Sequence, residues 1–238
     1  MQSAVTHVRG RVLSAMPPKV KSTRVDKAYE RLKADILNGK LPPGFQAPEP
    51  DIAGRLGMSR TPVREALIRL EAERLVDLIP RRGARVLAIS KKDICEVFEI
   101  LSVLEGLAAA SAAKGKCSDL MLDRIEEAVT CAENALNAGD MDAWAVLDDR
   151  FHRLIAQGSE NARLDEMISG LLNQVFRGTL VLVRMNKGPA ADPGDHRALY
   201  EAIRAEDPEK ASTVAREHRL AGLARMKQVL EDCGLPHV

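Results

Sequence analysis

The chain has 238 residues, of which 45% are hydrophobic and 3% aromatic, so it holds enough apolar material for two ordinary hydrophobic cores. Four widely spaced cysteines without a CxxC pair argue against a disulfide framework and a sequential zinc knuckle. There is no long apolar run and no signal-peptide core near the start, so the sequence predicts a soluble, cytoplasmic protein without a membrane span.

The formal net charge of +1 conceals an uneven distribution of charge along the chain. Residues 1–92 hold 19 Lys and Arg against 9 Asp and Glu, whereas the remaining residues hold 16 against 25. A basic segment suits a polyanion, which an acidic segment would repel. The split favours a DNA-facing first part and a second part with a sensing role; chance segregation of surface charge is the alternative.

The first segment, residues 1–23, mixes basic residues, prolines and small residues without sustained periodicity, which predicts a flexible leader. Met16 is an alternative start to Met1. Apolar residues then recur on one helical face from Val25 to Asn38, and the Leu-Pro-Pro-Gly sequence at 41–44 turns the chain. The first predicted element is therefore a helix.

A short helix, a tight turn and a longer helix follow. The short helix is predicted over Asp51–Leu56, Gly57 makes the turn, and the longer helix runs from Thr61 to Arg74, with Ser59 placed to cap it. On the longer helix, Ile68 is expected to pack inward with its leucine neighbours. This order of elements is a helix-turn-helix.

Two short apolar runs, Leu75–Ile79 and Ala84–Ile89, flank a polar tip and predict a two-stranded hairpin, or wing. The sequence from Ser90 to Asp93 resembles a capping box that opens the next helix. From there on only amphipathic helices are predicted, over residues 91–113, 118–137, 140–157, 161–186, 193–205 and 208–231. Acid-proline pairs mark the starts of the last two.

The predicted fold class is mainly α, with an N-terminal winged helix-turn-helix and a C-terminal antiparallel helical bundle. The expected organisation is a leader over residues 1–23, a winged domain over 24–90, a helical domain over 91–232 and a tail over 233–238.

The densest motif is the segment from Ser59 to Glu71, SRTPVREALIRLE. Hydroxyls and free amides at a helix N-terminus can hold phosphate, and Arg60 and Arg64, four residues apart, project from one face, where arginine can fork onto guanine edges. The segment resembles the recognition helix of the GntR family of bacterial regulators, and the resemblance spans residues 25–89. It implies binding to double-stranded operator DNA.

The expected DNA contacts lie at the start of this helix and at the tip of the wing. They are Ser59, Arg60, Thr61, Pro62, Arg64, Arg81, Arg82 and Gly83. The alternative is that the arginines form an exposed basic face and Ser59 is merely a cap. One position departs from the family pattern, because Glu49 is followed by Pro50 where the family commonly has an arginine, so one DNA contact is expected to be absent.

A second motif suggests a metal site. Asp148 and His152 lie four residues apart and so share one face of a helix, where a carboxylate and an imidazole can share a cation. Taken alone, such a pair is more often a hydrogen bond or solvated surface. His196 and His218 strengthen the metal hypothesis, because each lies among apolar residues of a predicted helix.

Asp-x-x-Phe-His followed by two further histidines resembles the FCD effector domain of FadR-like GntR regulators, over residues 92–232. The resemblance implies that Asp148, His152, His196 and His218 bind one divalent ion per chain. The ligand set suits Zn²⁺, Ni²⁺, Mn²⁺ or Fe²⁺ and leaves positions for water or an effector carboxylate. Asp149 is the rival to Asp148.

The subfamily often places an effector-binding arginine where this chain has Leu101, which weakens the expectation of a small organic-acid effector. Arg177 and Arg184 are candidate substitutes; solvated surface arginines are the alternative.

Together the resemblances imply a homodimeric, DNA-binding transcription regulator, in most relatives a repressor, controlled by a small-molecule effector at the metal. One alternative keeps DNA binding and makes the metal structural, or the signal itself. Another is a metalloenzyme, which is disfavoured because the chain offers no separate general base or nucleophile motif. The sequence therefore predicts a regulator and not an enzyme.

Overall fold

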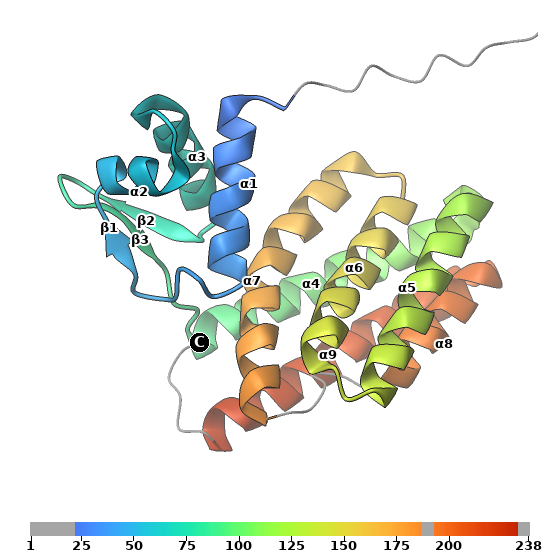
Figure 1. Ribbon diagram of the computed structural model, residues 1–238. Helices are drawn as coiled ribbons and strands as arrows, with labels where there is room; N and C mark the ends of the chain where they lie inside the picture. Colours follow the sequence, from blue (N-terminus) through green and yellow to red (C-terminus); the bar gives the residue numbers. More distant parts are fainter. Residues whose placement is uncertain (1–21, 187–192, 233–238) are drawn as a thin grey trace, which may run out of the picture.

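The computed structural model describes residues 22–186 and 193–232 and shows two groups of elements (Figure 1). The first comprises α1 (Arg24–Leu37), β1 (Gln46–Ala47), α2 (Glu49–Leu56), α3 (Arg60–Ala72), β2 (Val76–Ile79) and β3 (Gly83–Val86). The second comprises α4 (Lys91–Ser111), the π-helical turn η1 (Ala112–Lys116), α5 (Asp119–Asn137), α6 (Met141–Gly158), α7 (Ala162–Asn186), α8 (Pro193–Arg204) and α9 (Pro208–Asp232).

The first group forms around α1 and α3. A capping box starts α1, since the Thr23 hydroxyl accepts a hydrogen bond from the Asp26 amide while the Asp26 carboxylate accepts one from the Thr23 amide, both at 3.0 Å. Leu32 of α1 and Leu67 and Leu70 of α3 are buried in one hydrophobic core. Packing in this core fixes the orientation of α3 relative to α1.

The wing is a three-stranded antiparallel sheet in the order β1-β3-β2. Val76 pairs with Val86 and Ile79 with Gly83 across the predicted hairpin. The third strand, β1, pairs Gln46 with Arg85 and was not predicted, because two residues are too few to show an alternating pattern.

The second group is a helical bundle with a separate core. Figure 1 shows α5, α6 and α7 side by side, with α4 and α9 running across them. The predicted capping box opens α4, since the Ser90 hydroxyl accepts from the Asp93 amide at 3.1 Å and the Asp93 carboxylate accepts from the Ser90 amide at 3.0 Å. Phe98, Phe151 and Ile168 are among the buried residues of this core.

The predicted fold class is confirmed, and the predicted helices begin and end within three residues of the observed bounds. Local signals explain this agreement, because caps and prolines set helix ends without help from distant residues. The leader as far as residue 21, Asp192 and the tail lie outside the described residues. Of the helices that are described, none is both long and apolar enough to cross a membrane.

Candidate metal centre and DNA-reading surface

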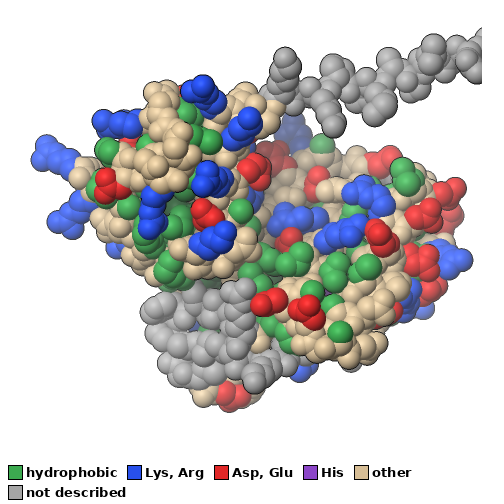
Figure 2. Space-filling view, in the orientation of Figure 1, with side chains coloured by type: hydrophobic (Ala, Val, Ile, Leu, Met, Phe, Trp, Pro, Cys, Tyr) green, Lys and Arg blue, Asp and Glu red, His purple; other side chains and the backbone are tan. Residues whose placement is uncertain are grey.

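Helix α3 has one buried and one exposed face. Val63 and Leu67 are buried in the first core, whereas Arg60, Thr61 and Arg64 are exposed. The first turn of α3 contains no acidic residue, so nothing within it neutralises the positive end of the helix dipole. In the space-filling view, Lys and Arg side chains gather over α2, α3 and the wing, whereas acidic and basic side chains alternate over α5, α6 and α7 (Figure 2).

Ser59 and Pro62 differ in what they offer a ligand. Ser59 occupies the N-cap position, but its exposed side chain makes no capping hydrogen bond, so the expectation that its hydroxyl caps the helix is wrong. The hydroxyl can instead donate to a phosphate oxygen beside the amides of the first turn. Pro62, also predicted as a DNA contact, is buried, so it shapes the start of α3 and offers little surface to DNA.

An open groove of about 620 Å³ separates α3 from the wing. Arg60, Arg64 and Ile68 line it from α3, and Arg81 and Gly83 line it from the wing. Ile68 is 49% exposed, contrary to the expectation that it packs inward. The reason is its spacing, since residues four apart on a helix share a face and Ile68 follows Arg60 and Arg64 in that series.

Gly83 allows β3 to lie close to Ala47 of β1 and to Pro48. Its φ is +85°, and a Cβ at this position would lie 2.1 Å from the Ala47 carbonyl oxygen. Arg81 and Arg82 are exposed at the tip, whereas Arg85 is held by an ion pair on the sheet. Glycine is therefore required at position 83 by the backbone, whereas the side chains of Arg81 and Arg82 are free to contact DNA.

Three helices bring the four predicted metal ligands together inside the bundle. Asp148 and His152 come from α6, His196 from α8 and His218 from α9, and all four are buried. One ligand atom from each lies within 4.8 Å of the others. His152 Nε2 lies 3.2 Å from His218 Nε2, and Asp148 Oδ1 lies 3.2 Å from His196 Nε2. Ligands of a tetrahedral zinc ion lie roughly 3.3–3.6 Å apart, so these separations suit a shared ion.

His196 carries the observation that best tests the fit of a metal. Its Nε2 is buried and makes no hydrogen bond within the described part of the chain, although Asp148 Oδ1 lies 3.2 Å away. A buried polar atom without a partner costs about 1–3 kcal/mol. A divalent ion between the imidazole and the carboxylate would satisfy both, so the residues fit a metal.

The ring nitrogens on the outer side of the cluster face carboxylates. His152 Nδ1 lies 3.3 Å from Glu105 Oε2, and His218 Nδ1 lies 3.4 Å from Asp195 Oδ2. Donation from Nδ1 to a carboxylate leaves the Nε2 lone pair free to point at a metal. Glu105 in turn accepts two hydrogen bonds from Arg219, at 2.5 and 2.7 Å.

The protonation of the imidazoles follows from these surroundings. Burial lowers the pKa of His218 to about 4, against the opposing hydrogen bond to Asp195, and burial also lowers the pKa of His196. Although burial opposes it, the neighbouring carboxylates, Glu105 foremost, raise the pKa of His152. At neutral pH two imidazoles are therefore neutral, and metal binding would release any proton held by His152.

The rival metal ligand and the two predicted effector-binding arginines are not part of this cluster of four ligands. Both oxygens of Asp149 accept from Arg153, at 2.7 and 2.9 Å, so Asp149 is not part of the cluster. Arg177 donates to the Leu87 carbonyl between the wing and α4 and is not among the residues that line the cavity beside Asp148 and His218, so its role as an effector ligand stays a prediction. The side chain of Arg184 lies outside the described residues.

A small cavity adjoins the cluster. It is lined by Asp148, His218 and Arg219, with Val175 and Thr179 contributed by α7. Its volume of about 10 Å³ is room for roughly one water molecule.

Glu105 and Arg219 are functional candidates that sequence reasoning missed. Each is at most 3% exposed, and they form a buried ion pair between α4 and α9. One signal was present, because Glu105 is the only charged residue between Ile100 and Ala110. A lone acid in an apolar helical run is seldom buried without a partner.

Both groups of elements match known protein families. Residues 24–86 match the family described as "Bacterial regulatory proteins, gntR family", and residues 96–221 match the FCD domain. A probable D-xylose utilization operon transcriptional repressor from Paenarthrobacter nicotinovorans is 30% identical over 204 residues, covering 85% of this chain and 88% of its own.

One further relative and one solved structure agree with these matches. An uncharacterized HTH-type transcriptional regulator in the TAR-I ttuE-ttuC' intergenic region of Agrobacterium vitis is 40% identical over 138 residues, which are 56% of this chain and 78% of its own. The solved structure of E. coli McbR/YncC has a TM-score of 0.74 at 26% identity, covering 87% of this chain and 98% of its own. The curated names describe transcription regulators, not enzymes.

Proposed function

The chain belongs to the gntR family of bacterial regulatory proteins and carries its FCD domain, and we propose that it is a repressor whose operator affinity is set at a divalent metal in the helical domain. Family membership makes it a transcription regulator rather than an enzyme, as the sequence predicted. In this proposal a small organic acid binds beside the metal and changes the operator affinity.

The observation that carries the proposal is the buried cluster of four ligand atoms within 4.8 Å, together with the unpartnered Nε2 of His196. Asp148, His152, His196 and His218 would hold the ion. When bound, Zn²⁺, Ni²⁺, Mn²⁺ or Fe²⁺ supplies open coordination positions that can accept a carboxylate. Glu105 and Asp195 orient two of the imidazoles from outside.

The experiment is a calorimetric titration of chelator-stripped protein with Zn²⁺, followed by a panel of small carboxylic acids. We expect one ion per chain, and we expect heat from an acid only in the Zn²⁺-bound protein. Acid binding of equal affinity without the metal, or no ion binding at all, would contradict the proposal.

A second candidate function keeps the operator and the metal but makes the metal ion itself the signal. The observation that favours it is the size of the cavity beside the ligands, which at about 10 Å³ leaves no room for an acid without movement of α7 or α9. The titration separates the two, because this candidate requires ion binding and no response to any acid.

The surface of α4 and α9 supports a homodimer. Ile100, Val103 and Leu107 follow one another along one face of α4, and Leu220 lies on α9; each is 48–54% exposed. Apolar side chains of this size on one surface are typical of a contact with a second copy.

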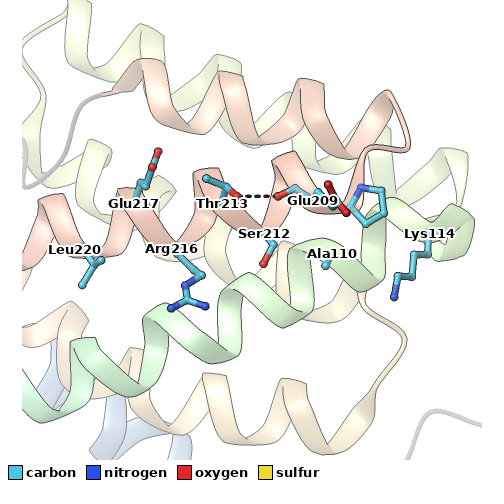
Figure 3. Close-up of a pocket in the computed structure, with 9 residues that line it drawn as sticks. Ala110, Lys114, Glu209, Ser212, Thr213, Arg216, Glu217 and Leu220 are labelled. Carbon is cyan, nitrogen blue, oxygen red and sulfur yellow. Dashed lines mark hydrogen bonds between the residues drawn. The ribbon is translucent and has the colours of Figure 1, made fainter.

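Beside this apolar strip an open groove of about 820 Å³ lies between α4 and α9 (Figure 3). Lys114 and Arg216 line it together with Glu209 and Glu217. A patch with both signs of charge can complement itself across a two-fold axis. A dimer built here would present two copies of α3 to a palindromic operator.

Leu107→Glu is expected to weaken the dimer about 10- to 100-fold, because it buries one carboxylate per chain among apolar side chains of the contact. Sedimentation equilibrium gives the dissociation constant. Leu120→Glu on α5, where the leucine is 71% exposed, is the matched control and should leave the dimer intact. An unchanged dimer with Leu107→Glu would assign the contact to another surface.

Asp195→Ala is expected to lower the affinity for Zn²⁺ about 10- to 100-fold, because His218 loses the acceptor that orients its ring. The folded apo protein should persist, since the Asp195 side chain is 38% exposed. Chelator competition measures the affinity. Asp119→Ala, which removes an exposed acid from the first turn of α5, is the control; equal Zn²⁺ affinity in both variants would contradict the role of Asp195.

A further inference from the structure

Helix α7 connects the helical bundle to the DNA-reading part of the chain. Asn173 Nδ2 donates to Glu73 Oε2 at 3.0 Å, and one turn later Arg177 donates to the Leu87 carbonyl. Asn173 is 2% and Arg177 5% exposed. Glu73 is the C-cap of α3 and Leu87 directly follows β3, so both contacts are made at the ends of elements that carry the DNA-reading residues.

Glu73 is the meeting point of three helices. Its carboxylate accepts from the Tyr29 hydroxyl of α1, lies 3.1 Å from Lys33 Nζ, and accepts from Asn173 of α7. Hydrogen bonds to an ionised group are about twice as strong as neutral ones. The end of α3 is therefore fixed to α1 and α7 by one side chain.

The other end of this contact reaches the helix that carries two of the metal ligands. Asn173 Oδ1 accepts from Arg153 at 2.9 Å, and Arg153 makes two hydrogen bonds to Asp149. Arg153 directly follows His152 in α6, and Asp149 directly follows Asp148. A continuous series of hydrogen bonds thus runs from the metal-ligand segment of α6 through Asn173 to the cap of α3.

The opposite face of α7 borders the cavity beside the cluster. Val175 and Thr179 line that cavity, whereas Asn173 and Arg177 face the DNA-reading part. Residues two apart on an α-helix point about 200° from each other, which explains how one helix serves both sides. A change in the position of α7 at the cavity therefore moves the side chains that hold α3.

We propose that Asn173 and Glu73 are positioning residues through which the metal centre sets the orientation of α3. This inference rests on the proposed function, because it needs operator affinity to depend on the metal. The competing account is a fixed joint that holds the two parts together equally with and without metal. The two accounts differ in whether breaking the contact changes the coupling between metal and DNA.

The test uses Asn173→Asp, which sets a carboxylate against Glu73 while keeping an acceptor for Arg153. The double variant Asn173→Asp with Glu73→Gln restores an amide-carboxylate pair with the roles exchanged. Asn134→Asp, at an exposed position of α5, is the matched control. Glu73→Ala breaks the same contact from a partly exposed site and serves if Asn173→Asp does not fold.

The probe is Zn²⁺ alone, and the DNA is a duplex selected from a random pool by the unsubstituted protein. Allosteric couplings are typically about 5- to 150-fold. We expect Asn173→Asp to reduce the Zn²⁺-dependent change in DNA affinity to less than about twofold, and the double variant to restore it. Zn²⁺ affinity should stay unchanged throughout. Amide exchange at the end of α3 should respond to Zn²⁺ in the unsubstituted protein and not in Asn173→Asp.

The possible outcomes distinguish a failure of the proposed function from a failure of the role assigned to the Asn173–Glu73 contact. If Zn²⁺ leaves DNA affinity unchanged in the unsubstituted protein, the inference is overturned. The proposed function is contradicted only if the acid also leaves the affinity of the Zn²⁺-bound protein unchanged. If Zn²⁺ changes DNA affinity there and changes it equally in Asn173→Asp and Glu73→Ala, the contact is a fixed joint and the inference is overturned.

Discussion

Replacing His196 with alanine is expected to lower the affinity for Zn²⁺ by more than about 100-fold. Loss of an outer hydrogen-bond partner alone costs about 10- to 100-fold, and His196 would supply a ligand atom itself. In the unsubstituted protein, Zn²⁺ at about 1,000 times its dissociation constant should add about 4 kcal/mol to the free energy of unfolding. For a chain of this size that corresponds to a rise in Tm of roughly 8–16 °C, which the variant should not show.

Elemental analysis and thermal melting with and without Zn²⁺ measure both effects. His196→Gln is a second variant, which leaves a smaller cavity than alanine does beside Phe151. The centroids of the Phe151 and His196 rings lie 4.3 Å apart. His7→Ala is the matched control, because His7 is not one of the four ligands. If His196→Ala retained one ion per chain with an unchanged rise in Tm, the assigned ligand set would be wrong.

Replacing Arg64 with alanine is expected to weaken operator binding about 5- to 150-fold, the range that corresponds to one base contact of about 1–3 kcal/mol. Arg60→Ala should have a similar effect, because both side chains are exposed on the same face of α3 and line the same groove. The double variant should lose roughly the product of the two. Fluorescence anisotropy with the selected duplex at fixed salt measures each affinity.

The control for these variants is Arg124→Ala, an exposed arginine on α5 far along the chain from the DNA-reading motif. It removes the same charge and should leave operator affinity within about twofold. Loss of affinity that is equal in Arg64→Ala and Arg124→Ala would mean that net charge, not the groove of α3, governs binding.

Sequence reasoning succeeded where the signal is local. Capping boxes, acid-proline pairs and the apolar period of 3.6 set the ends of helices, and these depend on residues within one turn. Asp148 and His152 share a face of α6 by spacing alone. His196 and His218 followed from the family resemblance, and the structure brings all four together.

The features that the sequence did not predict depend on contacts between distant parts of the chain. β1 exists because it pairs with β3, and Glu105 is buried because Arg219, 114 residues away, neutralises it. Arg177 donates a hydrogen bond to the Leu87 carbonyl, between the wing and α4, and no pattern in the sequence of α7 predicts this contact. Such contacts follow from the packing of helices, which periodicity does not fix.

The central claim is that the metal centre controls operator binding. The most direct measurement is the operator affinity of one preparation in four states: chelator-stripped or Zn²⁺-bound, each with and without the acid that gives heat in the titration. The account predicts that the acid changes affinity at least about fivefold in the Zn²⁺-bound protein and not in the stripped protein. The same affinity in all four states would contradict it.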